Sequence, residues 1–291
     1  MDKNLIQRLI TGTVFVVVLV GGIMWNEWSF FGLFLLITIL GLWEFYRLSA
    51  HVPAAPWRIY GTAVGALIFA AFFFKQYLGL NSVLLGLIPF LFLPFFFELY
   101  TKSDKPFTNL AYTFMGWIYV ALAFALWGLI VAPHWQEGFC EMDEKTGMAT
   151  LYATGMTKYS GKILLGFFII LWTSDSLAYV CGRLFGKHKL FERISPKKTW
   201  EGFIGGMIFT IAAAWIVWYF LRSLPVFDWM VMAGIVAATG TLGDLAESMF
   251  KRSIGIKDSG TILPGHGGIL DRFDAVLLAS PFVTSYLLLR Y

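Results

Sequence analysis

Residues 28–46 read WSFFGLFLLITILGLWEFY, an apolar run of 19 residues in which Glu44 is the one charged side chain. A helix of about 20 apolar residues is long enough to cross the hydrocarbon core of a bilayer. Water is absent from that core, so every backbone polar group must be paired within its own segment, and this favours a helix. The run therefore predicts a membrane-spanning helix.

Similar runs recur along the chain. The 291 residues are 58% hydrophobic, a larger apolar share than in a soluble domain. Only 14% are charged, and the mean hydropathy is +0.71. We predict an all-α, polytopic integral membrane protein built as a single membrane domain, residues 1–291, with N-terminal spans in 1–132, an outer loop at 133–160 and further spans in 161–291. The nine expected spans are 8–25, 28–46, 59–75, 80–99, 110–132, 161–181, 203–221, 228–250 and 269–290.

Lysine and arginine orient these spans, because cytoplasmic loops carry an excess of both. With the N-terminus in the cytoplasm, 16 of the 22 Lys and Arg fall on the cytoplasmic side and 6 on the outer side. An odd number of spans then puts the C-terminus outside. We expect a multi-pass protein of the plasma (inner) membrane. This asymmetry accounts for the net charge of +4, which gives no reason to expect nucleic acid as a partner.

Carboxylates inside spans are costly and by default indicate function. Gly240 and Gly243 allow another helix to come close just before one of these carboxylates, Asp244. Glu44 and Glu98 lie near cytoplasmic span ends, where nothing indicates phosphate, and they are interpreted as interfacial anchors. For Asp175 and Glu247, the alternative is a structural role as the partner of a nearby arginine or backbone group. The candidates for one inward-facing polar cavity are Asp175, Asp244, Glu247, Asp271 and Asp274.

The densest run of charge, residues 248–274, reads SMFKRSIGIKDSGTILPGHGGILDRFD. Its glycine turn, 265–268, allows backbone to come close to a ligand, and Asp271 and Asp274, three apart, would share one helix face. Carboxylates for an ion beside cations for phosphates suit a metal–phosphate complex. On composition alone, a solvated loop whose acids complement a helix dipole is an equal alternative.

A second basic stretch, residues 182–202, reads GRLFGKHKLFERISPKKTWEG. Ser195 before Pro196 is typical of a helix start, with serine as the N-cap and proline at the first helical position. Free N–H groups at a helix N-terminus, together with Lys197, Lys198 and the Thr199 hydroxyl, predict an anion site. The alternative is a positive-inside anchor for the next span.

Both stretches resemble the phosphatidate cytidylyltransferases, the CDP-diacylglycerol synthases. The order Asp, Ala-Tyr, Gly-Arg, Phe-Gly-Lys and Ser-Pro-x-Lys-Thr-Trp-x-Gly is matched from Asp175 to Gly202. The resemblance covers residues 175–274 in detail, whereas the first 150 residues match only as apolar spans. The family signature is matched without departure by Ser248, Lys251-Arg252, Lys257-Asp258, His266-Gly267-Gly268, Asp271-Arg272 and Asp274.

The resemblance implies transfer of the cytidylyl group of CTP to phosphatidate, which gives CDP-diacylglycerol and pyrophosphate in phospholipid biosynthesis. The attacking phosphate is already anionic, so catalysis would rest on charge neutralisation and in-line positioning rather than on a strong base. The resemblance also implies Mg²⁺ held by Asp244 and Asp271, with Asp175 and Asp274 orienting the ligands and a second cation left open. A homodimer is implied by the family alone.

Each remaining residue receives a role in the same way. The expected catalytic residues are Asp244, Asp271, Lys251, Arg252, His266 and Arg272. The expected substrate-binding residues are Ser195, Lys197, Lys198, Thr199, Lys257, Asp258, Gly267 and Gly268.

Three other functions are weighed against this one. A cation- or proton-coupled transporter also uses intramembrane acids, but here the charges gather on one side, without midplane pairs in two matching halves. A CDP-alcohol phosphotransferase would need a motif of closely spaced aspartates around Asp-Gly and Ala-Arg, and that motif is absent from the sequence. An inactive scaffold is disfavoured by the intact set of aspartates.

Overall fold

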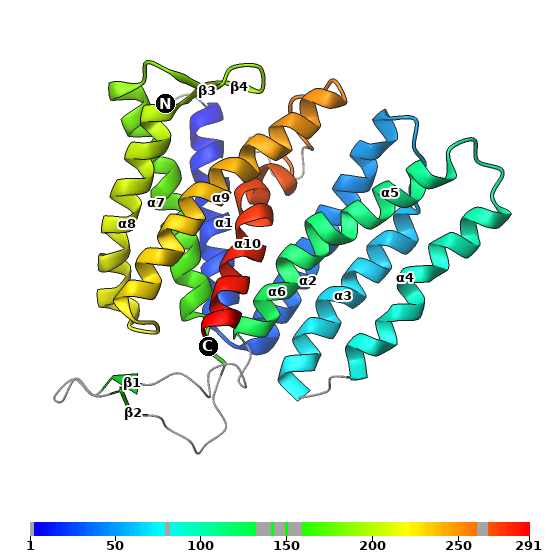
Figure 1. Cartoon of the computed structure of the whole chain (residues 1–291), viewed down its shortest axis with the longest axis horizontal. Helices are drawn as coiled ribbons and strands as arrows, with labels where there is room; N and C mark the ends of the chain where they lie inside the picture. Colours follow the sequence, from blue (N-terminus) through cyan, green and yellow to red (C-terminus); the bar gives the residue numbers. More distant parts are fainter. Residues whose placement is uncertain (1–2, 79–81, 132–140, 143–148, 151–158, 261–266) are drawn as a thin grey trace.

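The computed structural model describes residues 3–78, 82–131, 141–142, 149–150, 159–260 and 267–291. Helices dominate these residues, and two short hairpins accompany them (Figure 1). The long helices are α1 (Lys3–Met24), α2 (Glu27–Leu48), α3 (Arg58–Leu78), α4 (Ser82–Tyr100), α5 (Pro106–Gly116), α6 (Leu122–Val131), α7 (Lys162–Phe185), α8 (Trp200–Leu221), α9 (Val226–Ser253) and α10 (Leu270–Arg290). The short elements are η1 (Ser49–His51), η2 (Trp117–Ala121), β1 (Glu141–Met142), β2 (Ala149–Thr150), β3 (Lys189–Phe191) and β4 (Ser195–Thr199).

Eight helical segments in the described residues are long and apolar enough to cross a membrane. They correspond to the second through ninth predicted spans, and the first predicted span corresponds to the apolar part of α1, Leu9–Met24. Helix α5, the π-helical turn η2 and α6 together make one of these segments, Pro106–Val131. The prediction of an all-α, multi-pass membrane protein is confirmed.

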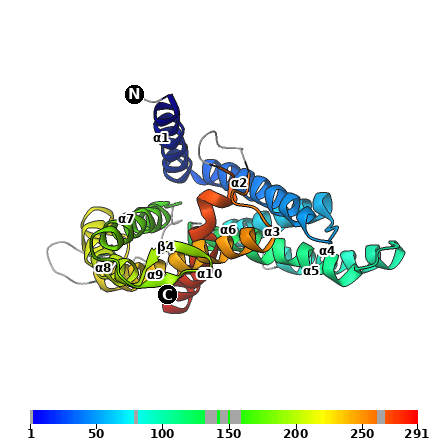
Figure 2. The same ribbon diagram turned by 90° about the horizontal axis from the view of Figure 1, so that it is seen from above.

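Helices α2 to α6 and helices α7 to α9 occupy different ends of the molecule (Figure 1 and Figure 2). Helices α7, α8 and α9 pack consecutively at one end, and α9 packs on α10. Helices α2, α3 and α6 form a second group, with α4 on its outer edge, and α10 also contacts α6. Figure 2 shows α7 and α8 at the opposite end from α4 and α5, with α10 between them. Helix α10 therefore joins the N-terminal spans to the C-terminal ones.

Small residues let the C-terminal helices come close together. A Cβ added at Gly206 of α8 would lie 2.8 Å from the Cβ of Ala178 on α7. A Cβ at Gly243 of α9 would lie 2.7 Å from the carbonyl oxygen of Asp274 on α10. The expectation of close helix approach before Asp244 is met, and it brings the part of α9 that carries Asp244 and Glu247 against the start of α10.

Polar side chains join the central helices inside the apolar core. The indole Nε1 of buried Trp127 on α6 donates to Ser280 Oγ on α10 at 2.8 Å. The hydroxyl of buried Tyr46 on α2 donates to the carbonyl of Thr113 on α5 at 2.8 Å. Such groups are stable in an apolar interior because each has its hydrogen bond.

The ends of the helices sort onto two sides. The start of α1, the β3–β4 hairpin and the beginning of α10 lie on one side, and β1, β2 and the C-terminus lie on the other (Figure 1). This is the relative arrangement expected from the basic loops and from the outer loop at 133–160. That the first side faces the cytoplasm stays a prediction.

Candidate functional site

A cavity of about 540 Å³ opens on the side of the β3–β4 hairpin. The ends of α7 and α9, the hairpin and the start of α8 enclose it. It combines carboxylates, cations and small residues, so a phosphate group could enter and meet charged side chains. Its lining residues are Asp175, Ala178, Tyr179, Gly182, Arg183, Leu190, Lys197, Lys198, Thr199, Gly202, Phe203, Thr241 and Asp244.

The helix start predicted at Ser195 is wrong. Ser195–Thr199 form strand β4, which pairs antiparallel with β3, with Phe191 opposite Ser195 and Lys189 opposite Thr199. Pro196 is tolerated because a two-stranded hairpin has only edge strands, where a missing N–H need not break a ladder. Helix α8 begins at Trp200 instead, and the Thr199 hydroxyl caps it by accepting from the Gly202 N–H at 3.2 Å.

The helix N-terminus nearest the two lysines is therefore that of α8. Thr199 and Gly202 both line the cavity, so the start of α8 is at the cavity, as the argument requires. The positive end of a helix dipole favours anions at such a position, although the N–H groups of Trp200 and Gly202 already donate to His188 O and Thr199 Oγ1. Lys197 and Lys198 reach the cavity from the strand, whereas Ser195 is not among its lining residues.

Asp244 meets Lys198 across the cavity. Lys198 Nζ lies 2.7 Å from Asp244 Oδ2 and donates to the carbonyl of Thr241 at 3.3 Å. Ser248 Oγ donates to Asp244 Oδ1 at 3.2 Å. The Asp244 side chain is 40% exposed, so its carboxylate can also meet a ligand. Asp175 lines the same cavity, so two of the five predicted acids share it.

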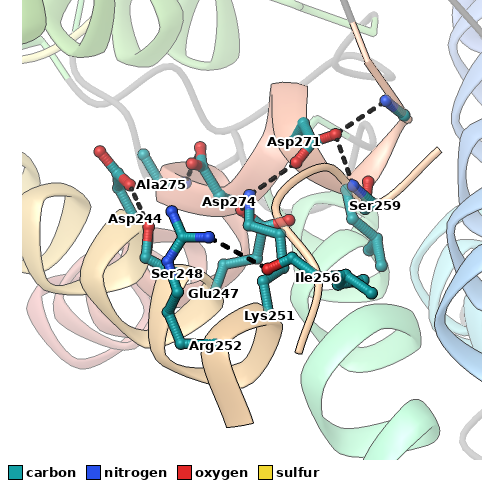
Figure 3. A network of polar contacts seen from close by, with 12 residues as sticks. Asp244, Glu247, Ser248, Lys251, Arg252, Ile256, Ser259, Asp271, Asp274 and Ala275 are labelled. Carbon is teal, nitrogen blue, oxygen red and sulfur yellow. Dashed lines mark hydrogen bonds and ion pairs between the residues drawn. The ribbon is translucent and has the colours of Figure 1, made fainter. Parts of the chain in front are cut away.

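The second group of charges lies beside the cavity, where α9 meets α10, and is centred on Lys251 (Figure 3). Lys251 Nζ lies 2.8 Å from Glu247 Oε2 and 2.6 Å from Asp271 Oδ1. The three side chains are 12%, 1% and 9% exposed, respectively. Glu247 is therefore part of a buried ion pair, and its partner is Lys251 rather than the arginine or backbone group of the alternative.

Asp271 also binds the backbone of two described residues in the 248–274 stretch. Its Oδ2 accepts from the backbone N–H groups of Ser259 and Gly268, each at 2.9 Å. Gly267 has φ +85°, and a Cβ there would lie 2.5 Å from Asp271 Oδ2. Only glycine adopts such a backbone readily. Gly267 thus makes room for the Asp271 carboxylate and Gly268 donates to it, while the predicted contact of both glycines with substrate stays a prediction.

Glu44 belongs to this group, and its interpretation as an interfacial anchor is wrong. The side chain comes from α2 and is 1% exposed. Its Oε2 accepts from the Ile269 N–H at 2.7 Å and from the Leu270 N–H at 3.4 Å. Ser259 Oγ donates to its Oε1. A contact with partners more than 200 residues away gives no local pattern that sequence analysis could detect.

The other predicted residues lie around these two groups. Asp274 Oδ1 accepts from the Ala275 N–H at 2.7 Å, and Figure 3 shows its side chain pointing the same way as that of Asp244. Arg252 donates to the carbonyl of Ile256 at 3.1 Å. Lys257, Asp258 and Arg272 are exposed. His266 lies outside the described residues.

The carboxylates are compatible with Mg²⁺, although the described part of the chain has no site in which protein side chains alone would surround the ion. No group of three or more His, Cys, Asp or Glu is arranged there to hold a metal ion. Mg²⁺ usually takes only one or two protein carboxylates, and phosphate oxygens and water complete its shell. Asp244 fits because it is exposed in the cavity. Asp271 could offer its Oδ1 as a ligand if Lys251, which contacts that atom in this structure, moved away.

Fold and site together define a class: a polytopic helical membrane protein with a cationic cavity and paired carboxylates on one side. The model of the cytidylyltransferase family matches residues 6–290, and the chain belongs to this family. The family match gives no support to the transporter alternative.

Several curated relatives are named phosphatidate cytidylyltransferase. The Staphylococcus haemolyticus protein is 42% identical over 152 residues, which cover 52% of this chain and 58% of the relative. The Haemophilus influenzae protein is 45% identical over 129 residues, 43% of this chain and 45% of the relative. A Staphylococcus aureus protein is 47% identical over 122 residues, 42% and 47% of the two chains. The chain spans about half the length of the curated relatives it matches.

Proposed function

We propose that this protein transfers the cytidylyl group of CTP to phosphatidate and releases pyrophosphate. The observation that carries the proposal is the cavity, which is lined by Lys197, Lys198 and the start of α8 together with Asp175 and Asp244. The relatives' names support the same reaction. A phosphate oxygen of phosphatidate would form a bond to the α-phosphorus of CTP. The bond from that phosphorus to the oxygen bridging to the β-phosphate would break, and pyrophosphate would take the electron pair.

The main obstacle to this reaction is repulsion between two anionic substrates. Lys197, Lys198 and Arg183 line the cavity, and charge-assisted hydrogen bonds from such groups to phosphate are strong. We assign the triphosphate to this cavity. The exposed cations Arg252, Lys257 and Arg272 are then assigned to the phosphate of the lipid. Positioned cations that offset phosphate charge are the main catalytic device in phosphoryl transfer.

Asp244 and Asp271 would hold Mg²⁺, which when bound neutralises phosphate charge. Lys198 and Lys251 now contact these two carboxylates and hold them in place. Substrate phosphates would compete for both lysines, so each carboxylate would gain a free oxygen as its lysine turned to phosphate. Asp175 and Asp274 would orient groups around them. A second cation is not needed for this assignment.

The setting of the reaction is part of the same proposal. We place the site on the cytoplasmic face of the inner membrane, where CTP is available and where the basic loops are predicted. Phosphatidate would come from the bilayer that surrounds the apolar helices. The homodimer implied by the family remains a prediction.

The test is turnover of purified protein in detergent micelles with labelled CTP and phosphatidate. Asp244→Asn should lose at least about a hundredfold in turnover, in the range seen when one charge-stabilising group is removed. Asp228→Asn is a matched control, because Asp228 lies on the same helix but binds Tyr286 and Arg290 at its other end. No lipid product from the wild type, or near wild-type turnover of Asp244→Asn, would contradict the proposal.

A chelator separates the metal from the rest of the assignment. EDTA should abolish turnover, and excess Mg²⁺ should restore it. Turnover that survives EDTA would remove Mg²⁺ from the scheme while leaving the transfer reaction intact.

A further inference from the structure

Glu44 connects the N-terminal half of the molecule to the signature. It lies near the end of α2, and its contacts are the backbone N–H groups of Ile269 and Leu270 and the hydroxyl of Ser259. Ile269 is the N-cap of α10. The first N–H groups of a helix have no partner within the helix, and Glu44 satisfies two of them. Its negative charge also complements the helix dipole there.

Ser259 links Glu44 directly to Asp271. Its hydroxyl donates to Glu44 and its backbone N–H donates to Asp271 Oδ2. Asp271 itself is in the first turn of α10. The Glu44 carboxylate therefore holds both the loop residue that binds Asp271 and the helix start that carries it. Residue 259 and residues 269–270 are thus both fixed to one buried side chain.

Two glycines leave the space that this carboxylate occupies. A Cβ at Gly268 would lie 1.5 Å from Glu44 Oε1, and a Cβ at Gly260 would lie 2.8 Å from the same atom. Contacts this short exclude any side chain at Gly268 while Glu44 keeps its place. The second glycine of the His-Gly-Gly element is thus explained by Glu44.

Burying the Glu44 carboxylate has a free-energy cost. It costs free energy unless hydrogen bonds compensate it, and well-packed apolar side chains often do as well or better for stability alone. Apolar packing would not fix three specific donors, however. The charge at Glu44 is therefore explained by the need to hold these donors in position, not by the overall stability of the protein.

We infer that Glu44 is a positioning residue, which fixes the Asp271 carboxylate beside Lys251 and thereby places the phosphate-binding groups for transfer. This role in the reaction rests on the proposed function, whereas the brace itself does not. Glu44 is not among the residues lining the 540 Å³ cavity. Its loss should therefore lower kcat for cytidylyl transfer more than it raises KM for CTP.

Hydrogen–deuterium exchange of the full chain in detergent tests the brace without using activity. In Glu44→Ala, the amides of Ile269 and Leu270 should exchange at least about tenfold faster, because their acceptor is gone and a tenfold change needs only about 1.4 kcal/mol. Glu44→Gln should keep exchange slow, since its amide oxygen still accepts. Glu98→Ala is the matched control: Glu98, on α4, is buried too, but it accepts from Trp57 Nε1 and does not contact the start of α10.

Kinetics on the same variants test the positioning. Glu44→Ala should lose on the order of tenfold to hundredfold in kcat, as expected for displacement of a catalytic group by about 1 Å, with KM for CTP within about threefold of wild type. Glu44→Gln should recover most of kcat. Should Glu44→Ala fail to fold, Ser259→Ala removes one contact and should shift exchange and kcat in the same direction.

The outcomes distinguish the two claims. Unchanged exchange at residues 269–270 in folded Glu44→Ala, or in Ser259→Ala if that variant has to be used, would overturn the brace. Faster exchange with wild-type kcat would overturn the positioning role. A wild type that makes no CDP-diacylglycerol would overturn the proposed function and with it this role, while faster exchange would still support the brace.

Discussion

Replacing Lys251 by methionine would leave two buried carboxylates facing each other without the cation between them. Lys251 Nζ is 2.8 Å from Glu247 Oε2 and 2.6 Å from Asp271 Oδ1. Asp271 would keep its two backbone donors. Glu247 would be worse placed, because its other oxygen, Oε1, is buried without a hydrogen-bond partner in the described structure.

The expected cost follows from this burial. Removing one partner of a buried ion pair destabilises a protein by about 3–5 kcal/mol. For a chain of this size that corresponds to a fall of roughly 6–20 °C in melting temperature. The double variant Lys251→Met/Glu247→Gln removes the uncompensated charge as well. It should recover at least about 1 kcal/mol, the cost of a buried group left without its partner.

Intrinsic tryptophan fluorescence during heating in detergent measures both variants. Lys102→Met serves as the control, because Lys102 is an exposed lysine on a connection far from this network. Lys251→Met melting within about 2 °C of wild type would refute the reasoning, since that is less than 1 kcal/mol. A double variant no more stable than the single one would refute the assignment of the cost to Glu247.

Three further substitutions test other contacts. Lys198→Ala should raise KM for CTP by roughly tenfold to hundredfold in steady-state assays, the range for a lost charge-assisted hydrogen bond; an unchanged KM would count against the triphosphate assignment. Gly206→Leu should force α7 and α8 apart and yield little monodisperse protein on gel filtration, whereas Gly32→Leu, where a Cβ has open space, should behave as wild type. Thr199→Ala should lose about 1 kcal/mol through the missing N-cap, seen as a melting temperature lower by a few degrees, and an unchanged value would argue against the cap.

The spans were predictable because each is a continuous apolar run, and that is a local property. The same holds for the close approach of α9 and α10 at Gly243, which follows from a small residue beside intramembrane acids. The π-helical turn at Trp117–Ala121 was not predicted, because nothing local in an apolar run marks where a helix widens. Local patterns thus predicted the elements and left out their irregularities.

The failures concern residues whose state depends on distant partners. Ser195-Pro196 resembles a helix start, but pairing with Lys189–Phe191 makes it a strand and moves the cap to Thr199. Glu44 was interpreted from its neighbours alone, and its partners come from the other end of the chain. Of the five acids predicted to share one cavity, Asp175 and Asp244 line it, whereas Glu247, Asp271 and Asp274 are not among its lining residues. The engagement of Asp271 by Lys251 and two backbone amides could not be inferred from spacing.

Two positions of label in CTP test the central claim most directly. Purified protein in mixed micelles receives phosphatidate and Mg²⁺ with CTP labelled at either the α- or the γ-phosphate, and the lipid and aqueous phases are counted separately. Cytidylyl transfer predicts that the α-label enters the lipid phase and that the γ-label leaves as pyrophosphate. Lipid carrying the γ-label, or no labelled lipid from either substrate, would contradict it.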